Sequence, residues 1–206
     1  MKGLLINNFY SSIGNIKLFL TIVLAVAAIV LVTGNPTAQE LFVYITITAL
    51  SINAVVSSRK DAISNWNKFE ITMPVRRTDI IKSKYLSYIF WLGVGTGLAL
   101  AVTMVTMLVH GIGNDIYSMF ALGIGISLFV GALFFPIAYL VGTDKSETVL
   151  IISVLVAITL AVLILNVLNQ FISYFIVRMA AFITIYILFF AFSYVITLRI
   201  YAKKEL

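Results

Sequence analysis

The sequence contains no cysteine, one histidine and three prolines among its 206 residues, and only 11% of its residues are charged. Without cysteine, the chain can form no disulfide, thiol nucleophile or cysteine-ligated metal site. No Walker sequence for binding nucleotide phosphates occurs, so this chain alone cannot hydrolyse ATP. Hydrophobic residues make up 62% of the chain, which leaves no material for a separate soluble domain.

Six apolar runs dominate the sequence, and we interpret them as helices that cross a membrane. A bilayer core about 30 Å thick is crossed by roughly 20 residues of helix, and most of the runs meet that length. The predicted spans lie near Leu18–Val32, Leu41–Val56, Tyr85–Val109, Tyr117–Val141, Thr148–Leu165 and Met179–Leu198. The predicted fold class is an all-α integral membrane protein with six transmembrane helices in a single domain, residues 1–206.

Lysine and arginine are distributed unevenly between the two sides of these spans. Thirteen of the fourteen fall on the side that holds both termini, and only Arg178 falls on the other. Because basic loops stay in the cytoplasm, we expect the N- and C-termini to be cytoplasmic. The net charge of +6 then reflects membrane orientation and contact with acidic lipid headgroups, and it does not indicate nucleic-acid binding.

The interior of the predicted spans contains no Asp, Glu, Lys, Arg or His. A charged side chain at the bilayer centre costs about 2.5–3.5 kcal/mol and persists where function requires it. The absence of such residues argues against an ion-coupled carrier, an intramembrane protease and a metal enzyme. His110 falls in a predicted external turn, where we interpret it as an ordinary loop residue.

Two segments outside the spans are strongly apolar. Residues 1–17 predict an interfacial amphipathic helix, because apolar residues recur there at helical spacing: Leu4, Leu5, Phe9, Ile13 and Ile16. Residues 166–178, on the external side, are too apolar for a solvated loop and too short to cross the membrane. We therefore expect them to form an interfacial or re-entrant segment.

The long cytoplasmic loop, residues 57–84, predicts a short amphipathic helix. Its apolar residues fall at positions i, i+4, i+7 and i+11, namely Ala62, Trp66, Phe69 and Met73. Asp61 suits the N-terminus of this helix, and Pro74 ends it. Thr78 and Asp79 then suit the start of the next helix. Aromatic residues ringed by polar ones favour docking into a cytoplasmic partner, although packing under the bundle or against lipid is the alternative.

Small residues spaced four apart predict two faces on which helices can approach closely. One face comprises Gly93, Gly97 and Ala101, and the other comprises Gly123, Ser127 and Gly131. The first lies inside an apolar span with no strand before it, so its glycines do not indicate a nucleotide-binding loop. We expect both faces to serve helix packing rather than gating.

Together these features resemble the ABC type-2 permeases, the membrane subunits of ATP-driven exporters. The N-terminal helix, the six spans and a coupling helix between spans two and three all match that family. One stretch is more specific, and it resembles the loop signature of a small bacterial subfamily that includes the permeases of the phenol-soluble modulin exporter. That stretch is Trp66-x-x-Phe69-Glu70-x-x-x-Pro74-Val75-x-Arg77-x-Asp79-Ile80-Ile81-x-x-Lys84-Tyr85.

The resemblance implies a homo- or heterodimer of permease subunits in the bacterial cytoplasmic membrane, with one ABC ATPase docked under each coupling helix. ATP and magnesium would bind to the ATPase, and this chain would hold no cofactor or metal. Residues Trp66–Met73 would enter a cleft on the ATPase, and Glu70, Arg76 and Arg77 would pair around them. Residues 166–178 would correspond to the family's external re-entrant helices.

The resemblance also implies export of amphipathic peptides, either cytolytic or antimicrobial. Spans without charges suit such a cargo, and fifteen Phe and ten Tyr are available to line a path. The sequence does not identify which residues bind the substrate. The alternatives are an exporter of lipids or hydrophobic drugs, a non-transporting immunity or scaffold protein, and an ion-coupled carrier.

The predicted topology can be tested in this cysteine-free chain by introducing single cysteines. A Gly113→Cys variant should react with an impermeant maleimide in intact cells, because residue 113 lies in a predicted external loop. An Asn67→Cys variant should react only after permeabilisation, and the reverse pattern would overturn the orientation.

Overall fold

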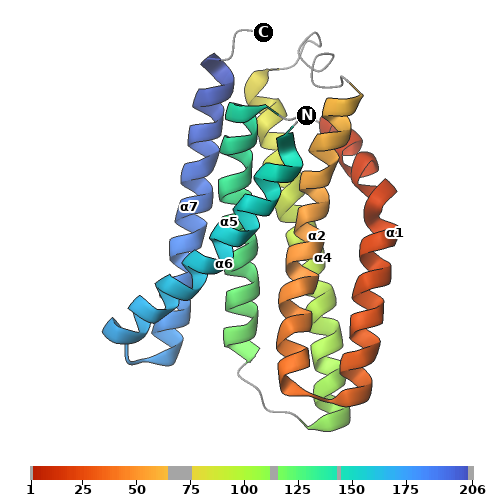
Figure 1. The fold of residues 1–206 in the computed structure, drawn as a ribbon, viewed down its shortest axis with the longest axis vertical. Helices are drawn as coiled ribbons and strands as arrows, with labels where there is room; N and C mark the ends of the chain where they lie inside the picture. Colours follow the sequence, from red (N-terminus) through yellow and green to blue (C-terminus); the bar gives the residue numbers. More distant parts are fainter. Residues whose placement is uncertain (1, 65–75, 112–115, 143–144, 204–206) are drawn as a thin grey trace.

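The fold consists of six long helices in a computed structural model that describes residues 2–64, 76–111, 116–142 and 145–203. They are α1 (Lys2–Thr33), α2 (Pro36–Ile63), α4 (Arg77–His110), α5 (Ile116–Val141), α6 (Ser146–Phe171) and α7 (Phe175–Lys203) (Figure 1). Each contains an apolar stretch of at least 18 residues, long enough to cross a bilayer. The six predicted spans are confirmed in number and type, and the described residues contain no β-strand.

Helices α2 and α5 form the centre of the bundle. In each of them 56% of the spanning residues are buried, against 17–22% in the other four helices. Helix α2 packs against α1, α4 and α5, while α5 packs against α6 and α7. Helix α6 crosses α5 obliquely, and its C-terminal end lies beside the start of α7 (Figure 1).

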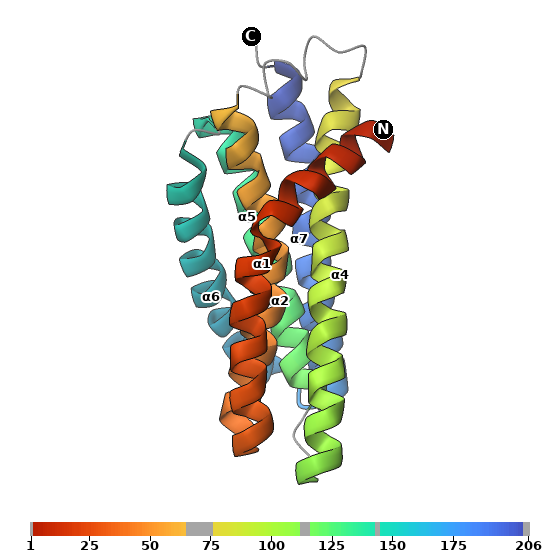
Figure 2. The ribbon, with the colours of Figure 1, turned by 90° about the vertical axis from the view of Figure 1, so that its right-hand side faces the viewer.

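Basic residues gather at one end of the bundle, where α1, α4 and α6 begin and α2, α5 and α7 end (Figures 1 and 2). The described side chains there include Arg76, Arg77, Lys82, Lys84, Lys145, Arg199 and Lys203. Arg178 lies in the first turn of α7, at the opposite end of that helix. This arrangement agrees with the predicted charge asymmetry, and the side of the membrane that the basic end faces stays a prediction.

The N-terminal segment is the first part of α1, which is helical without interruption from Lys2 to Thr33. This first part lies across α4 at an angle to the rest of α1 (Figure 2). Asn8 and Ser12 are buried against the bundle, while Ile6 and Tyr10 are exposed. The segment therefore presents a polar stripe to the protein and an apolar side outward, as an interfacial helix requires.

Residues 166–178 do not form a separate element. Helix α6 continues to Phe171 and α7 begins at Phe175, so only residues 172–174 connect them. No glycine or proline interrupts the chain after the predicted end of the fifth span, which explains why the helix continues. Phe171 and Tyr174 are about four-fifths exposed, and the position of this hairpin relative to the membrane stays a prediction.

Helix α4 packs tightly against the backbone of α2 at Gly95, which the four-residue spacing of small residues did not identify. A Cβ added at Gly95 would lie 3.1 Å from the Cα of Ile47 and 3.2 Å from the carbonyl oxygen of Thr46. By contrast, a Cβ added at Gly93 or Gly97 would have no neighbouring atom within 4 Å, and Ala101 is exposed. The face formed by Gly93, Gly97 and Ala101 thus points out of the chain, so packing there requires a neighbour from outside it.

The second small-residue face lies inside the bundle. A Cβ added at Gly123 would lie 3.0 Å from Cδ1 of Ile47, and one added at Gly131 would lie 2.7 Å from the ring of Tyr88. Ser127 between them is fully buried. These residues let α5 approach both α2 and α4.

The surroundings of Gly95 and Gly97 on α4 predict different effects of the same substitution on stability. Gly95→Leu should lower the midpoint of thermal unfolding of the purified chain, because overpacking a tight contact costs about 1–3 kcal/mol. Gly97→Leu should leave that midpoint unchanged, since the added side chain enters open space. Equal midpoints for the two variants would contradict this assignment of the contact face.

Candidate functional site

The predicted ATPase-docking residues lie at the basic end of the bundle, where α2 ends and α4 begins. Asp61 and Ala62 belong to the last turn of α2, so the prediction that Asp61 begins a separate helix is wrong. No glycine or proline separates the second span from these residues, and the helix therefore continues to Ile63. The remaining predicted residues, Trp66, Phe69, Glu70, Met73 and Pro74, lie outside the described residues, and their docking role stays a prediction.

Arg76 and Arg77 mark the start of α4. Arg76 is exposed, with extended backbone (φ −69°, ψ 138°), and Arg77 is the first helical residue. Asp79 lies in the first turn of α4, where its carboxylate faces the positive end of the helix dipole. The predicted start of this helix near Thr78 and Asp79 is confirmed.

Arg77 connects the start of α4 to the end of α7. Its Nη1 donates hydrogen bonds to the carbonyl oxygens of Tyr201 and Ala202, both at 3.5 Å. The last carbonyls of a helix have no partner within that helix, and a cation there also meets the negative end of its dipole. A movement of the segment before α4 would therefore be transmitted to α7 as well.

A buried polar cluster joins the first part of α1 to α4. The Nζ of Lys84, a residue only 4% exposed, donates to Oδ1 of Asn8 at 2.9 Å. Nδ2 of Asn8 donates to Oγ of Ser83 at 3.1 Å, and Ser83 in turn donates to the carbonyl oxygen of Ile80 at 2.7 Å. Hydrogen bonds to a charged group are the stronger kind, so this cluster fixes the position of the N-terminal segment.

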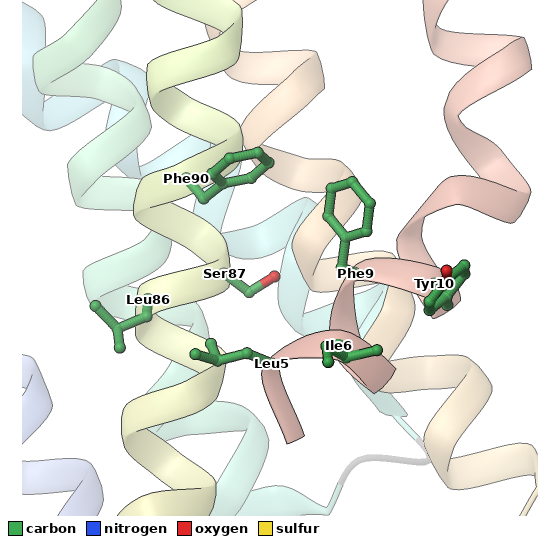
Figure 3. Close-up of a pocket in the computed structure, with 7 residues that line it drawn as sticks. All are labelled: Leu5, Ile6, Phe9, Tyr10, Leu86, Ser87 and Phe90. Carbon is green, nitrogen blue, oxygen red and sulfur yellow. The ribbon is translucent and has the colours of Figure 1, made fainter. Parts of the chain in front are cut away.

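An open groove of about 560 Å³ lies beside this cluster, between the first part of α1 and α4 (Figure 3). Its lining residues are Leu5, Ile6, Phe9, Tyr10, Leu86, Ser87 and Phe90. The hydroxyls of Tyr10 and Ser87 are the polar side-chain groups among them. No carboxylate, imidazole or amine lines the groove, so it can hold an apolar group but offers no acid, base or metal ligand of those kinds.

The core of the bundle contains hydroxyl groups that bond across helices. Ser51 of α2 and Ser127 of α5 lie 2.5 Å apart, Oγ to Oγ. The hydroxyl of Tyr88, on α4, donates to the carbonyl oxygen of Ser127 at 2.5 Å. Three helices thus meet at one buried polar point.

A second hydroxyl cluster joins α4, α5 and α7. The hydroxyl of Tyr85 lies 2.8 Å from Oγ of Ser193 and 2.9 Å from Oγ1 of Thr197. Oγ of Ser193 also donates to the carbonyl oxygen of Ala132 at 2.6 Å. Pro136, four residues after Ala132, has no N–H to bond that carbonyl, so α7 supplies the donor that α5 lacks.

Helix α2, in contrast to these hydrogen-bonded hydroxyls, buries polar side-chain atoms that have no hydrogen-bond partner. Gln39, Thr46 and Asn53 lie seven residues apart, which places them on one face of the helix, and each is at most 1% exposed. Oε1 of Gln39, Oγ1 of Thr46 and both amide atoms of Asn53 have no partner. Such atoms are rare in folded proteins and cost about 1–3 kcal/mol each.

The histidine serves the fold. His110 is the last residue of α4 rather than part of a turn, and its Nε2 donates to the carbonyl oxygen of Leu31 at 2.8 Å. A Cβ at Gly34 would collide with the imidazole, and Gly34 has a positive φ of 57° that favours glycine. Across the residues that the structure describes, no group of three or more His, Asp or Glu could hold a metal ion.

Apolar runs alone do not predict the hydroxyl clusters or the polar face of α2. A signal for the clusters exists in the sequence, because Tyr85 and Tyr88 are three residues apart and Ser193 and Thr197 are four apart. Each pair therefore shares a helix face within an apolar span. Which helices those faces contact depends on the packing of the whole bundle.

Comparison with known proteins identifies the family. No curated protein and no solved structure matches the chain. A family model described as an ABC-2 family transporter protein matches residues 3–202, nearly the whole chain. The predicted ABC type-2 permease is thereby confirmed, while the narrower resemblance to the phenol-soluble modulin exporters stays a prediction. The chain belongs to the ABC-2 transporter family, as a multi-pass membrane permease subunit that associates with an ABC ATPase.

Proposed function

We propose that this permease exports amphipathic peptides, of the cytolytic or antimicrobial kind, from the cytoplasm. The observation that supports this cargo is the chemistry of the buried spanning residues, which offer aliphatic, aromatic, hydroxyl and amide groups. Lys84 is the one buried charged residue among those described. An ion or a sugar would lose its hydration in such surroundings without compensation, whereas an amphipathic peptide has an apolar side to offer. A cationic peptide would also gather at the acidic inner leaflet.

In the proposed assembly, two permease chains form a homo- or heterodimer in the bacterial cytoplasmic membrane. Two ABC ATPase subunits bind ATP and magnesium, and each docks on the residues between α2 and α4. Helices α2 and α4 directly flank that segment, and Arg77 links it to α7. ATP-driven movement of the ATPase would therefore act on these three helices first.

Helix α2 is the one we expect to move most. Its unpartnered polar face means that the described conformation leaves stabilising hydrogen bonds unmade at Thr46 and Asn53. A displacement of α2 that brings this face to water would satisfy those atoms and offset part of the cost of separating packed helices. The displacement would break the bond between Ser51 of α2 and Ser127 of α5. Helices α4, α5 and α7 are joined by further hydroxyl bonds and would keep their arrangement.

This role of α2 predicts different effects of one substitution at two buried threonines. Thr46→Val removes an unpartnered hydroxyl, so it should raise the midpoint of thermal unfolding and lower ATPase activity stimulated by peptide. The matched control, Thr197→Val, removes a partner of Tyr85 and should lower the midpoint by the equivalent of about 0.6 kcal/mol. Equal destabilisation by both valines, with unchanged stimulation, would contradict the proposed movement of α2.

The peptide function is tested in cells that lack this chain. Such cells should accumulate amphipathic peptide and become sensitive to it, and the wild-type chain should reverse both effects. A chain with Trp66→Ala and Phe69→Ala should not reverse them and should lose its ATPase on purification, since aromatic hot spots contribute about 2 kcal/mol or more each. A control with Phe171→Ala and Tyr174→Ala, two exposed aromatic residues at the other end, should retain the ATPase.

Two results would contradict these expectations separately. Unchanged peptide secretion and resistance, with altered surface lipid instead, would show that the cargo is a lipid and not a peptide. Co-purification of the Trp66 and Phe69 double variant with its ATPase at wild-type affinity would show that the ATPase docks elsewhere.

A further inference from the structure

The groove between α1 and α4 is bounded by tightly packed aromatic residues. Phe9 of α1 stacks on Trp91 of α4, with ring centroids 5.9 Å apart and planes 11° from parallel. The Phe9 and Phe90 rings meet edge to face at 5.7 Å. Because the Asn8 and Lys84 hydrogen bond also holds α1 against α4, the groove is formed in advance of any occupant.

The face of α4 that lines the groove changes from basic to apolar along the helix. Lys82 is exposed and lies one turn from Leu86 toward the basic end, and Leu86 lies one turn from Phe90. Gly93 follows on the same face, with open space around it. The helix rises about 16 Å over the eleven steps from Lys82 to Gly93, close to half of a hydrocarbon core about 30 Å thick.

This order matches a membrane lipid with a negatively charged headgroup. The phosphate of such a lipid lies at the membrane surface, and the acyl chains of the lipid extend through one leaflet. Lys82 is placed to meet the phosphate, and the apolar groove that follows it is placed to meet an acyl chain. The groove opens on the outer side of the bundle beside exposed apolar residues such as Ile6 and Ile89, where lipid reaches it directly. A cationic peptide would instead meet the like charge of Lys82.

We propose that the groove binds one acyl chain of an anionic phospholipid whose phosphate pairs with Lys82. The lipid would cover the apolar side of the N-terminal segment and hold that segment against α4. This binding is separate from the proposed export function, because the lipid remains bound at the outer surface and is not the cargo.

Trp91 provides a reporter for the proposed lipid, since its ring contacts Phe9 and Phe90 and the only other tryptophan is Trp66. The full-length chain with Trp66→Phe is reconstituted into phosphatidylcholine vesicles that contain phosphatidylglycerol. Bromine atoms, which quench tryptophan fluorescence at short range, are placed on the acyl chains of one lipid or the other at equal mole fraction. Brominated phosphatidylglycerol should quench Trp91 with about a fivefold preference, the equivalent of about 1 kcal/mol.

Substitutions of Lys82 separate a specific site from the general lipid shell. Lys82→Gln should reduce quenching by brominated phosphatidylglycerol to the level of phosphatidylcholine, while Lys82→Arg should keep the preference. The matched control is Lys145→Gln, an exposed basic residue just before α6, which should also keep the preference. The helical circular dichroism of each variant shows that it is folded.

The proposal is overturned if quenching follows the mole fraction of brominated lipid regardless of its headgroup. It is equally overturned if a folded Lys82→Gln variant keeps the preference, or if Lys145→Gln abolishes it. None of these results would bear on peptide export, which is measured in cells by a different readout.

Discussion

Hydrocarbon offers no partner to a hydrogen-bonding group, and the arrangement of this bundle depends on that constraint. Lipid tails are as apolar as the helix surfaces, so little hydrophobic free energy draws the helices together. Close backbone contact and hydrogen bonds between helices must do so instead. Gly95 allows α4 to touch the backbone of α2, and Tyr85 and Tyr88 extend from α4 to bond with α5 and α7. Each such bond contributes only about 0.6 kcal/mol on average, so the bundle depends on several of them together.

Pro136 shows how this constraint links residues far apart in the sequence. A proline in the fourth span leaves the carbonyl of Ala132 without its helical donor, which is costly in a bilayer. Ser193, on the last span, supplies the missing donor and also bonds to Tyr85. One backbone defect in α5 is thereby connected to the hydroxyl groups of α4 and α7. These three helices are consequently coupled into one unit at this level of the bundle.

The features that depend on the length and composition of apolar segments could be predicted from the sequence. The features that depend on which helix faces contact one another could not. Six apolar runs and the start of α4 near Asp79 follow from helix length and end signals, and the structure contains both. The same signals could not show that α2 continues through Asp61, because Asp61 suits the start of a helix while the adjacent Arg59 and Lys60 suit the end of one. Spacing alone also could not distinguish Gly97, which faces outward, from Gly95, which contacts α2. That distinction depends on the rotation of α4 against its neighbours, which is set by all of its contacts together.

Some buried polar groups of the bundle have hydrogen-bond partners and others have none, and several of those without partners lie on α2. The hydroxyls on α4, α5 and α7 find partners on one another, and Ser51 of α2 bonds to Ser127 of α5. Thr46 and Asn53 on α2 find no partner. A helix with unmade hydrogen bonds gains more from a change of surroundings than a helix whose bonds are complete. Because α2 also leads directly into the residues predicted to contact the ATPase, the helix that gains most from moving is one on which the ATPase would pull directly. In the proposed mechanism, ATP binding would then have to overcome the difference between two partly satisfied arrangements of α2, rather than the disruption of the whole bundle.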